Sequence, residues 1–250
     1  MCLVVLNRWG TLGDHLSKGV HDANSGVCAD SVDGVSDGRG GSAQIVISEI
    51  MYNPNSNEGW PPDPNDPDSK GEPNKVEWVE IYNAGSEPMD ISGWALADED
   101  GQTGAIADGA IIGPGEAVVI VPIHTSPAAF HAAWGGTFAV YPVAHWGDGG
   151  LYNLANGPSP DNEILSLIDL DGVPVDVVNY DDEGDWPSDR PDGASIYLPA
   201  DMLDAELNDQ GANWRLSSVG SAGAKKNRPV GAFKGVDIGS PGRVPAATHE

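Results

Sequence analysis

The feature that most constrains the fold is the alternation of apolar and polar residues within short runs, as in EWVEIYNAG, residues 77–85. Successive side chains of a β-strand point to opposite faces, so Val79 and Ile81 share a face with Glu77 while Glu80 lies on the other. A catalytic carboxylate pair must converge on one group, and this odd spacing separates the two glutamates. We therefore expect Glu77 at the exposed beginning of a strand and Glu80 at the rim of a sheet.

Turn-forming residues separate these short runs along most of the chain. The 33 Gly and 20 Pro fall between apolar segments, and this punctuation favours an all-β protein. A hydrophobic content of 40% is enough for a core. Strands are predicted at 44–52, 76–83, 89–98, 104–112, 117–122 and 194–199, with a hairpin over 163–181 that turns at Asp171-Gly172. The predicted core includes Trp94, Leu96, Val118, Ile120, Leu167 and Val175.

Helical signals are few. Residues 126–135 form the one plausible helix, with Ser126 as N-cap and Pro127 at the first helical position. A short helical turn is expected at 201–207. Residues 53–74 contain six Pro and are predicted to hold no strand, and residues 211–250 are predicted to be irregular.

The predicted domain organisation has three parts. Residues 1–43 are rich in Gly, Ser and Asp and are expected to be a disordered leader. A single β-sandwich domain follows over 44–243, with long loop insertions at 53–74 and 123–150. Residues 244–250 are expected to be a disordered tail.

The charge is strongly negative, with 12 Lys and Arg against 38 Asp and Glu, a formal net charge of −26. This argues against non-specific binding to nucleic acid or to anionic lipid. Half of the positive residues lie in the last 36: Arg215, Lys225, Lys226, Arg228, Lys234 and Arg243. They are either a solvated loop that balances an acidic body or a small docking patch for an acidic partner.

Cysteine content and apolar runs leave the compartment open. Cys2 and Cys28 could form one disulfide but do not make a disulfide scaffold. No run approaches the ~18 apolar residues of a transmembrane helix. The run MCLVVL is too short for a signal-peptide core. Either the chain is not exported by that route or residues 1–43 come from an incorrectly chosen start codon.

Seven segments, in order, resemble the lamin tail domain family in its bacterial form. They are ISEIMYNP (47–54), EWVEIYNAGSEPMDISGWALAD (77–98), IIGPGEAVVIV (111–121), IDLDGVPVDVVNY (168–180), WPSDRPDGASIYL (186–198), NWRLSS (213–218) and GSPGR (239–243). The resemblance implies an immunoglobulin-like β-sandwich without catalytic residues or cofactors. It also implies a docking role, as in eukaryotic relatives, or a role beside exported enzymes and surface proteins, which would place the chain outside the cell or at its surface.

The sharpest chemical motif is DPDSKGEPNKVE, residues 66–77, which nearly fits the calcium-loop pattern D-x-[DN]-x-[DN]-G-x₅-E. Asp66, Asp68, Gly71 and Glu77 are in place, but Lys70 occupies a ligand position. A solvated loop is the alternative. DEDG (98–101), DLDG (169–172) and DDEGD (181–185) are weaker candidates for cation binding and are also typical of acidic turns.

Histidine and aromatic residues supply two further candidates. His124, His131 and His145 could form a zinc site, but Pro127 argues against a helix that would align the first two, and hydrogen-bonded or surface histidines are the alternative. Trp60, Trp134, Trp146, Trp186 and Tyr197 could form a platform for sugars or could be core and loop anchors.

The sequence thus favours a non-catalytic binding module with an unidentified protein partner and no assigned catalytic, cofactor or metal site. One alternative is a calcium-stabilised adhesive or carbohydrate-binding module. A second is a hydrolase that uses the carboxylates and histidines of 53–74 and 123–150.

Overall fold

The computed structural model describes most of the predicted domain. The described residues are 44–59, 73–99, 101–147, 150–151, 153–154, 164–188, 190 and 192–243, all within one unit that spans 39–250. The predicted leader (1–43) and tail (244–250) lie outside them, as do Asp66, Asp68 and Gly71 of the calcium-loop motif.

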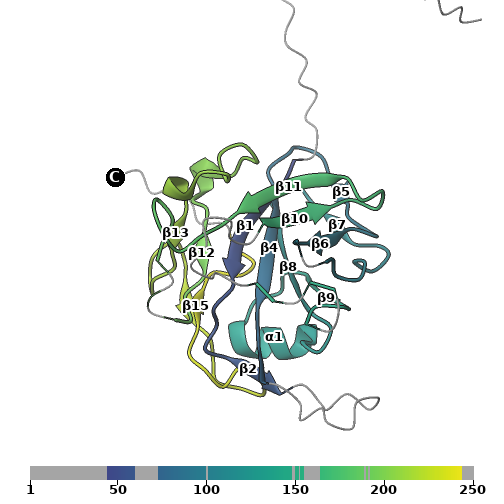
Figure 1. Cartoon of the computed structure of the whole chain (residues 1–250). Coiled ribbons are helices and arrows are strands. Elements are labelled where there is room, and N and C mark those ends of the chain that lie inside the picture. The colour runs from purple at the N-terminus through teal and green to yellow at the C-terminus, as the bar shows by residue number, and fades with distance from the viewer. Residues whose placement is uncertain are drawn as a thin grey trace, which may run out of the picture. The chain divides into compact units, whose positions relative to one another are not determined.

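The largest element is a six-stranded sheet with the order β13-β12-β1-β4-β8-β9 (Figure 1). Its strands are β1 (Ile45–Met51), β4 (Trp78–Asn83), β8 (Ala117–Pro122), β9 (Val140–Val143), β12 (Ile196–Tyr197) and β13 (Arg215–Leu216). Neighbours are antiparallel except β8 and β9, which are parallel. A bulge between Ile47 and Glu49 shifts the register of β1 against β4, so that Glu49 pairs with Glu80.

A three-stranded antiparallel sheet faces the first across the main core. Its order is β11-β10-β6, with β6 (Ala95–Ala97), β10 (Ile164–Ile168) and β11 (Pro174–Asn179). Side chains from both sheets fill the core between them, including Ile47, Val79, Ile81, Leu96, Val118, Ile120, Leu165, Leu167 and Val178. We call this side of the six-stranded sheet the sandwich face.

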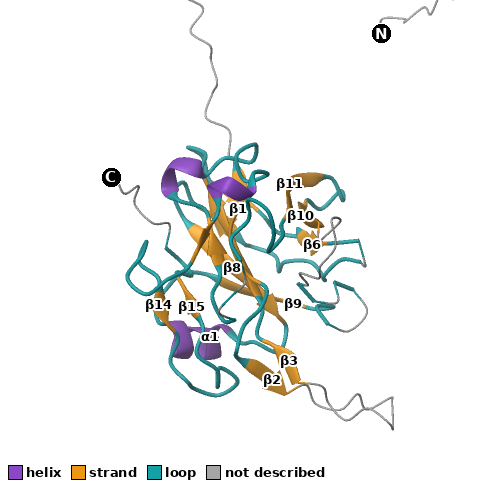
Figure 2. Cartoon of the chain, turned by 60° about the vertical axis from the view of Figure 1, so that its left-hand side comes forward, coloured by secondary structure: helices purple, strands orange, loops and turns teal. Residues whose placement is uncertain are grey.

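The opposite side, which we call the outer face, is also covered. Helix α1 (Pro127–Trp134) packs there, and Figure 2 shows it beside β14 (Lys225–Lys226) and β15 (Ile238–Gly239). A second apolar cluster joins the helix to the sheet through Met51, Trp78, Val119, Val121, Phe130, Trp134 and Phe233. Because both faces are covered, Val118 to Pro122 are all buried, which confirms the buried strand expected from AVVIVP.

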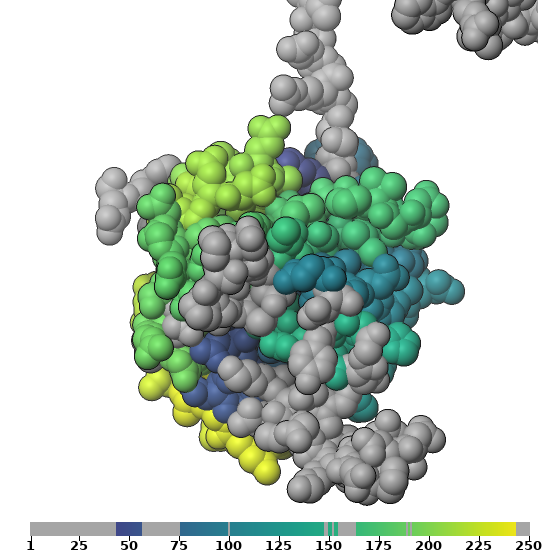
Figure 3. Space-filling model, viewed as in Figure 1, coloured from purple at the N-terminus to yellow at the C-terminus, as the bar shows by residue number. Residues whose placement is uncertain are grey.

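Three two-stranded sheets complete the fold. They pair β2 (Asn57–Gly59) with β3 (Pro73–Lys75), β5 (Met89–Asp90) with β7 (Ile111–Ile112), and β14 with β15. Two 3₁₀ helices, η1 (Ala200–Met202) and η2 (Gly211–Asn213), lie before β13. Figure 3 shows the green hairpin of β10 and β11 and the yellow C-terminal residues at opposite edges of the face drawn.

Most of the predicted elements are confirmed. The all-β class, the strands β1, β4 and β8 and the β10–β11 hairpin match the expected segments. Helix α1 begins as predicted, with Ser126 Oγ accepting from Ala129 N and Pro at its first turn. The predicted core residues are buried, with Val175 packed against the core from a half-buried position.

Four predictions about local structure are wrong. Residues 53–74 do contain strands, because β2 and β3 pair with each other. Residues 211–250 are not irregular throughout, since β13, β14 and β15 fall within them. The segment 89–98 breaks into β5 and β6, because Gly93 adopts a left-handed φ of 82°. Only Ile111–Ile112 of the segment 104–112 is a strand.

The insertion 123–150 is more than an elaboration between sandwich strands, because its β9 extends the main sheet by a parallel pairing with β8. None of the helices in the described part of the chain is long and apolar enough to cross a membrane.

Candidate functional site

The outer face of the main sheet holds two buried glutamates side by side. Glu49 of β1 and Glu80 of β4 are cross-strand partners and are 1% exposed each. Cross-strand neighbours in an antiparallel pair have Cβ atoms about 4.5–5.5 Å apart. Two carboxyl groups therefore lie close together within the protein, beside the Trp78 ring.

The partners of Glu49 come from late in the chain. Its Oε1 accepts from Ser195 Oγ at 2.5 Å and from Ser240 N at 2.8 Å, and its Oε2 accepts from Ser240 Oγ at 2.8 Å. Ser195 Oγ also lies 2.8 Å from Ser217 Oγ. Gly239 lies close against this pair, since a Cβ there would lie 3.0 Å from both Glu49 Oε1 and Trp78 Cζ2 and would require them to shift.

Glu80 is held by the bulge of β1 and by the same C-terminal segment. Ser48 Oγ donates to Glu80 Oε1 at 2.8 Å, and Gly242 N donates to Oε2 at 2.6 Å. The amide of Arg243 also hydrogen-bonds this carboxyl group. The GSPGR segment, 239–243, thus closes over both glutamates.

Burial raises the pKa values of both Glu49 and Glu80. Desolvation raises the pKa of Glu49 from 4.5 to about 7, although its hydrogen bonds from serines 195, 217 and 240 act in the opposite direction. Desolvation also raises the pKa of Glu80 well above its usual range, and the nearby Glu49 carboxyl raises it further. The pair therefore retains a proton near neutral pH, as expected when two adjacent acids cannot both ionise.

Glu77 lies on the opposite face from Glu80, as the spacing predicts, but it is not at an exposed strand end. It is 4% exposed, and its Oε2 accepts from Trp146 Nε1 at 3.2 Å and from Leu154 N at 2.8 Å. The prediction of a rim position for Glu80 is also wrong. Both errors have one cause, because the sheet is covered on both faces.

Two buried aspartates, Asp176 and Asp237, also accept hydrogen bonds from backbone amides. Asp176 of β11 accepts from Ile47 N at 2.6 Å, next to the bulge of β1, and from Asn208 Nδ2 at 2.7 Å. Burial raises the pKa of Asp176 to about 6. Asp237 accepts from Asn55 N and from Asn227 Nδ2, and burial raises its pKa too. Through these hydrogen bonds, each of the two carboxyl groups links segments that are far apart in the sequence.

Sequence reasoning missed Glu49, Asp176 and Asp237 as buried groups. The available signal was the placement of Glu49 inside the apolar run IVISEIM, where an acid in a fully buried strand needs internal donors. Those donors lie 146 and 191 residues further along the chain, so no local pattern identifies them.

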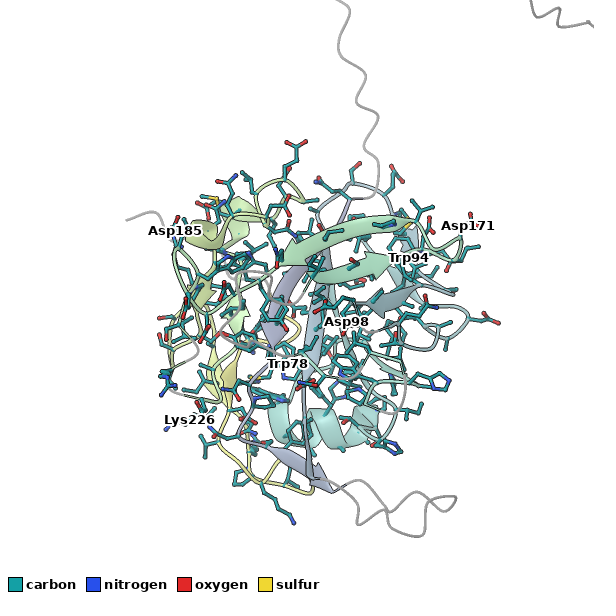
Figure 4. All side chains as sticks on the ribbon, in the orientation of Figure 1. Trp78, Trp94, Asp98, Asp171, Asp185 and Lys226 are labelled. Carbon is teal, nitrogen blue, oxygen red and sulfur yellow. The ribbon has the colours of Figure 1, made fainter. Side chains whose placement is uncertain are left out.

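The candidate acidic motifs do not converge on a metal site in the described part of the chain. Figure 4 shows Asp98, Asp171 and Asp185 on separate parts of the molecule. No group of three or more His, Cys, Asp or Glu side chains among the described residues could hold a metal ion. DDEGD contributes Asp181, Glu183 and Asp185 to an open hollow of about 660 Å³ that Trp186 and Asp209 also line.

The three histidines that were candidates for a zinc site do not form one in the described part of the chain. His124 and His145 are exposed, whereas His131 lies on α1 with its Nε2 2.9 Å from Phe138 O. Helix α1 begins at Pro127, so it does not reach back to His124.

The described aromatic residues do not form the sugar-binding platform that was one of the two alternatives for them. Trp134, Trp146 and Tyr197 are buried, and Trp186 is half-buried against Trp214 at a ring-centroid distance of 5.9 Å. Trp60 lies outside the described residues. The described members of this set are therefore core and loop anchors and do not form an exposed stacking surface.

A cleft of about 600 Å³ opens where the C-terminal segment crosses the outer face. We call it the Lys225 cleft. Its walls come from the start of β8, the end of α1 and the residues before β9, and from β14 and the GSPGR segment. Its lining includes Ile111, Glu116, Val118, Gly135, Thr137, Phe138, Lys225, Gly242 and Arg243. Two of the six positive residues near the C-terminus thus face one hollow.

Comparison with known proteins identifies the family. Residues 40–182 match the Lamin Tail Domain family, which covers more than half of the chain. No curated protein and no solved structure matches the chain. The immunoglobulin-like β fold, which the resemblance of the seven segments implied, is confirmed by this match and by the facing sheets. The chain belongs to the Lamin Tail Domain family.

Proposed function

We propose that this chain is a non-catalytic binding module of the lamin-tail type, and that it docks a partner protein in the Lys225 cleft. The observation that carries the proposal is the cleft itself, about 600 Å³ in volume and formed by segments from four parts of the chain. Pockets for small ligands measure about 300–1,000 Å³, so the cleft has room for a short segment of a partner protein and not for a whole domain.

The walls of the cleft are rigid enough to serve as a preformed site. β8 is an interior strand of the main sheet, between β4 and β9, and α1 is anchored to that sheet by Phe130 and Trp134. The GSPGR segment is held by its hydrogen bonds to Glu49 and Glu80. A preorganised site loses less conformational freedom on binding, which favours affinity.

The buried carboxyl groups do not favour a catalytic alternative. Glu49, Glu77, Glu80 and Asp176 are each covered, and each accepts hydrogen bonds from internal donors. An acid that takes part in catalysis must reach a substrate, whereas these groups contact only their own chain. Members of the Lamin Tail Domain family are also generally non-catalytic.

The test compares partner capture by the wild-type chain with capture by two tryptophan variants. Thr137→Trp places a large ring at an exposed position in the cleft, and Leu170→Trp places the same ring at the 70% exposed tip of the β10–β11 hairpin. Captured proteins are identified by mass spectrometry, purified and titrated back. A partner that binds wild type and Leu170→Trp equally but not Thr137→Trp supports docking in the cleft. Equal binding to all three chains would contradict it.

A further inference from the structure

We propose that the Lys225 cleft recognises an acidic segment of its partner protein, and that Lys225 and Arg243 determine this specificity. This inference rests on the function proposed above. It adds the chemistry of the partner, which the shape of the cleft does not give.

The first observation is a convergence of positive charge. Lys225 and Arg243 line the cleft, and Arg228 lies outside the lining but near enough for its charge to act on Lys225. A Cβ on Gly135 would lie 3.7 Å from Lys225 Nζ, and a Cβ on Gly223 would lie 3.7 Å from Arg243 Cδ. Lys225 is half-buried, and desolvation, with the positive charges of Arg243 and Arg228, lowers its pKa.

The second observation concerns the acidic residues around these positive side chains. Among the residues that the structure describes, no carboxylate forms an ion pair with any of the three side chains. Glu116 is the acid in the cleft lining, and its Oε2 accepts from Gly113 N at 2.9 Å. The C-terminal end of α1 favours one nearby cation through its dipole, but it does not account for three.

The third observation is the contrast with the rest of the chain. With 38 acidic residues against 12 basic ones, a cation in this protein would be expected to have acids around it. Lys225 and Arg243 in the cleft, with Arg228 nearby, make the potential there less negative than over the rest of the protein, and such a site attracts an anionic ligand.

Shape selects among anionic ligands. The cleft is concave, and Phe138, which is half-buried, and Ile111, which is 47% exposed, add apolar surface beside the cations. A short segment that carries carboxylates next to apolar side chains complements both features. A flat anionic membrane does not enter a concave site, and the net charge of −26 opposes the long-range approach of a nucleic acid.

The experiment measures binding of two synthetic peptides to the full chain by isothermal titration calorimetry. One peptide alternates Glu and Leu, and the second replaces every Glu by Gln. The test variant is Lys225→Gln with Arg243→Gln. The matched control is Lys226→Gln with Lys234→Gln, which removes the same charge from exposed positions outside the cleft lining; Lys226 is labelled at the edge of the molecule in Figure 4.

We expect the Glu peptide to bind wild type at least about tenfold more tightly than the Gln peptide, and the test variant to lose at least about tenfold in affinity. The control should change by less than about threefold, because exposed charges are screened. Arg228→Gln, at an exposed position outside the cleft lining, should behave like the control and change the affinity by less than about threefold. The melting temperature of each variant shows that it is folded.

Three results would overturn the inference. They are equal binding of both peptides, equal losses in the test and control variants, and tighter cleft-dependent binding of an oligonucleotide, inorganic phosphate or phosphatidylserine vesicles than of the Glu peptide. The proposed function and this inference can be distinguished by experiment. If Thr137→Trp abolishes partner capture while Lys225→Gln with Arg243→Gln leaves it unchanged, docking in the cleft stands and acidic recognition is wrong.

Discussion

The two faces of β4 are both buried but are closed in different ways. On the sandwich face, Val79 and Ile81 meet apolar side chains of the three-stranded sheet. On the outer face, Trp78 meets aromatic residues of α1, while Glu80 accepts from the Ser48 hydroxyl of β1 and from amides of a segment about 160 residues later. The comparison shows that strand alternation assigns residues to faces correctly, but whether a face is exposed depends on segments far away in sequence.

The largest effect should come from removal of residues 183–250, which leaves the whole family match, residues 40–182, intact. The cut deletes β12 and β13 and removes the donors to Glu49 from Ser195 and Ser240. Each buried acceptor left unsatisfied costs about 1–3 kcal/mol, against a total stability of about 5–15 kcal/mol. We expect no cooperative transition by calorimetry, whereas a chain that ends at Arg243 should unfold cooperatively. Near-wild-type melting of the shorter chain would show that the sandwich face alone sustains the fold.

The next effect concerns two glycines with the same backbone conformation. Gly242 on the outer face has φ 74°, and a Cβ there would lie 1.9 Å from the Phe138 ring; Gly172 in the β10–β11 hairpin has φ 76° with no atom within 4 Å of a Cβ. Gly172→Ala should cost about 1–2 kcal/mol from backbone strain alone. Gly242→Ala should cost about 2–3 kcal/mol more, because the methyl group must displace the ring. Equal losses in urea unfolding would mean that the GSPGR segment is not tightly packed.

A third prediction concerns pH. Raised pKa values mean that the folded chain binds more protons than the unfolded chain, so its stability is greatest below about pH 4.5 and falls as pH rises towards about 7. For Glu49 the shift from 4.5 to about 7 corresponds to about 3 kcal/mol.

Glu49→Gln mimics the protonated acid, so it should be close to wild type at pH 5 and more stable than wild type at pH 8. The exposed Glu87→Gln is the matched control and should keep the full pH dependence of wild type. A Glu49→Gln chain whose melting temperature falls with pH as steeply as that of wild type would show that Glu49 is ionised in the fold.

The smallest effect should come from Asp176, the acid that joins the two sheets. Both Ile47 N and Asn208 Nδ2 donate to its Oδ2. Asp176→Asn keeps an acceptor oxygen and should cost about 1 kcal/mol at pH 5, whereas Asp176→Ala leaves Ile47 N unsatisfied and should cost about 2–3 kcal/mol. If the two variants are equally stable in urea unfolding, the bond to Ile47 contributes nothing.

Much of the sandwich face could be predicted because its signals are local. The Asp171-Gly172 turn locates the β10–β11 hairpin, and the alternation around Val79 and Ile81 selects the core side. On the outer face helix α1 could be predicted, but the C-terminal part of the cover could not, because its strands are only two residues long and carry no periodicity. The Lys225 cleft could not be predicted either. Its basic residues were noted in the sequence, but their convergence depends on β14 pairing with β15 and on the crossing of the GSPGR segment.

The order of synthesis gives the Ser240–Glu49 hydrogen bonds a consequence for biogenesis. Ser240 follows Glu49 by 191 residues, and ribosomes add about 5–20 residues per second, so about 10–40 s separate the two. During that interval β1 and β4 can leave the ribosome and pair, but their acidic side remains hydrated and ionised. The GSPGR segment must then displace that water, so this part of the native core forms only after residues 239–243 have left the ribosome.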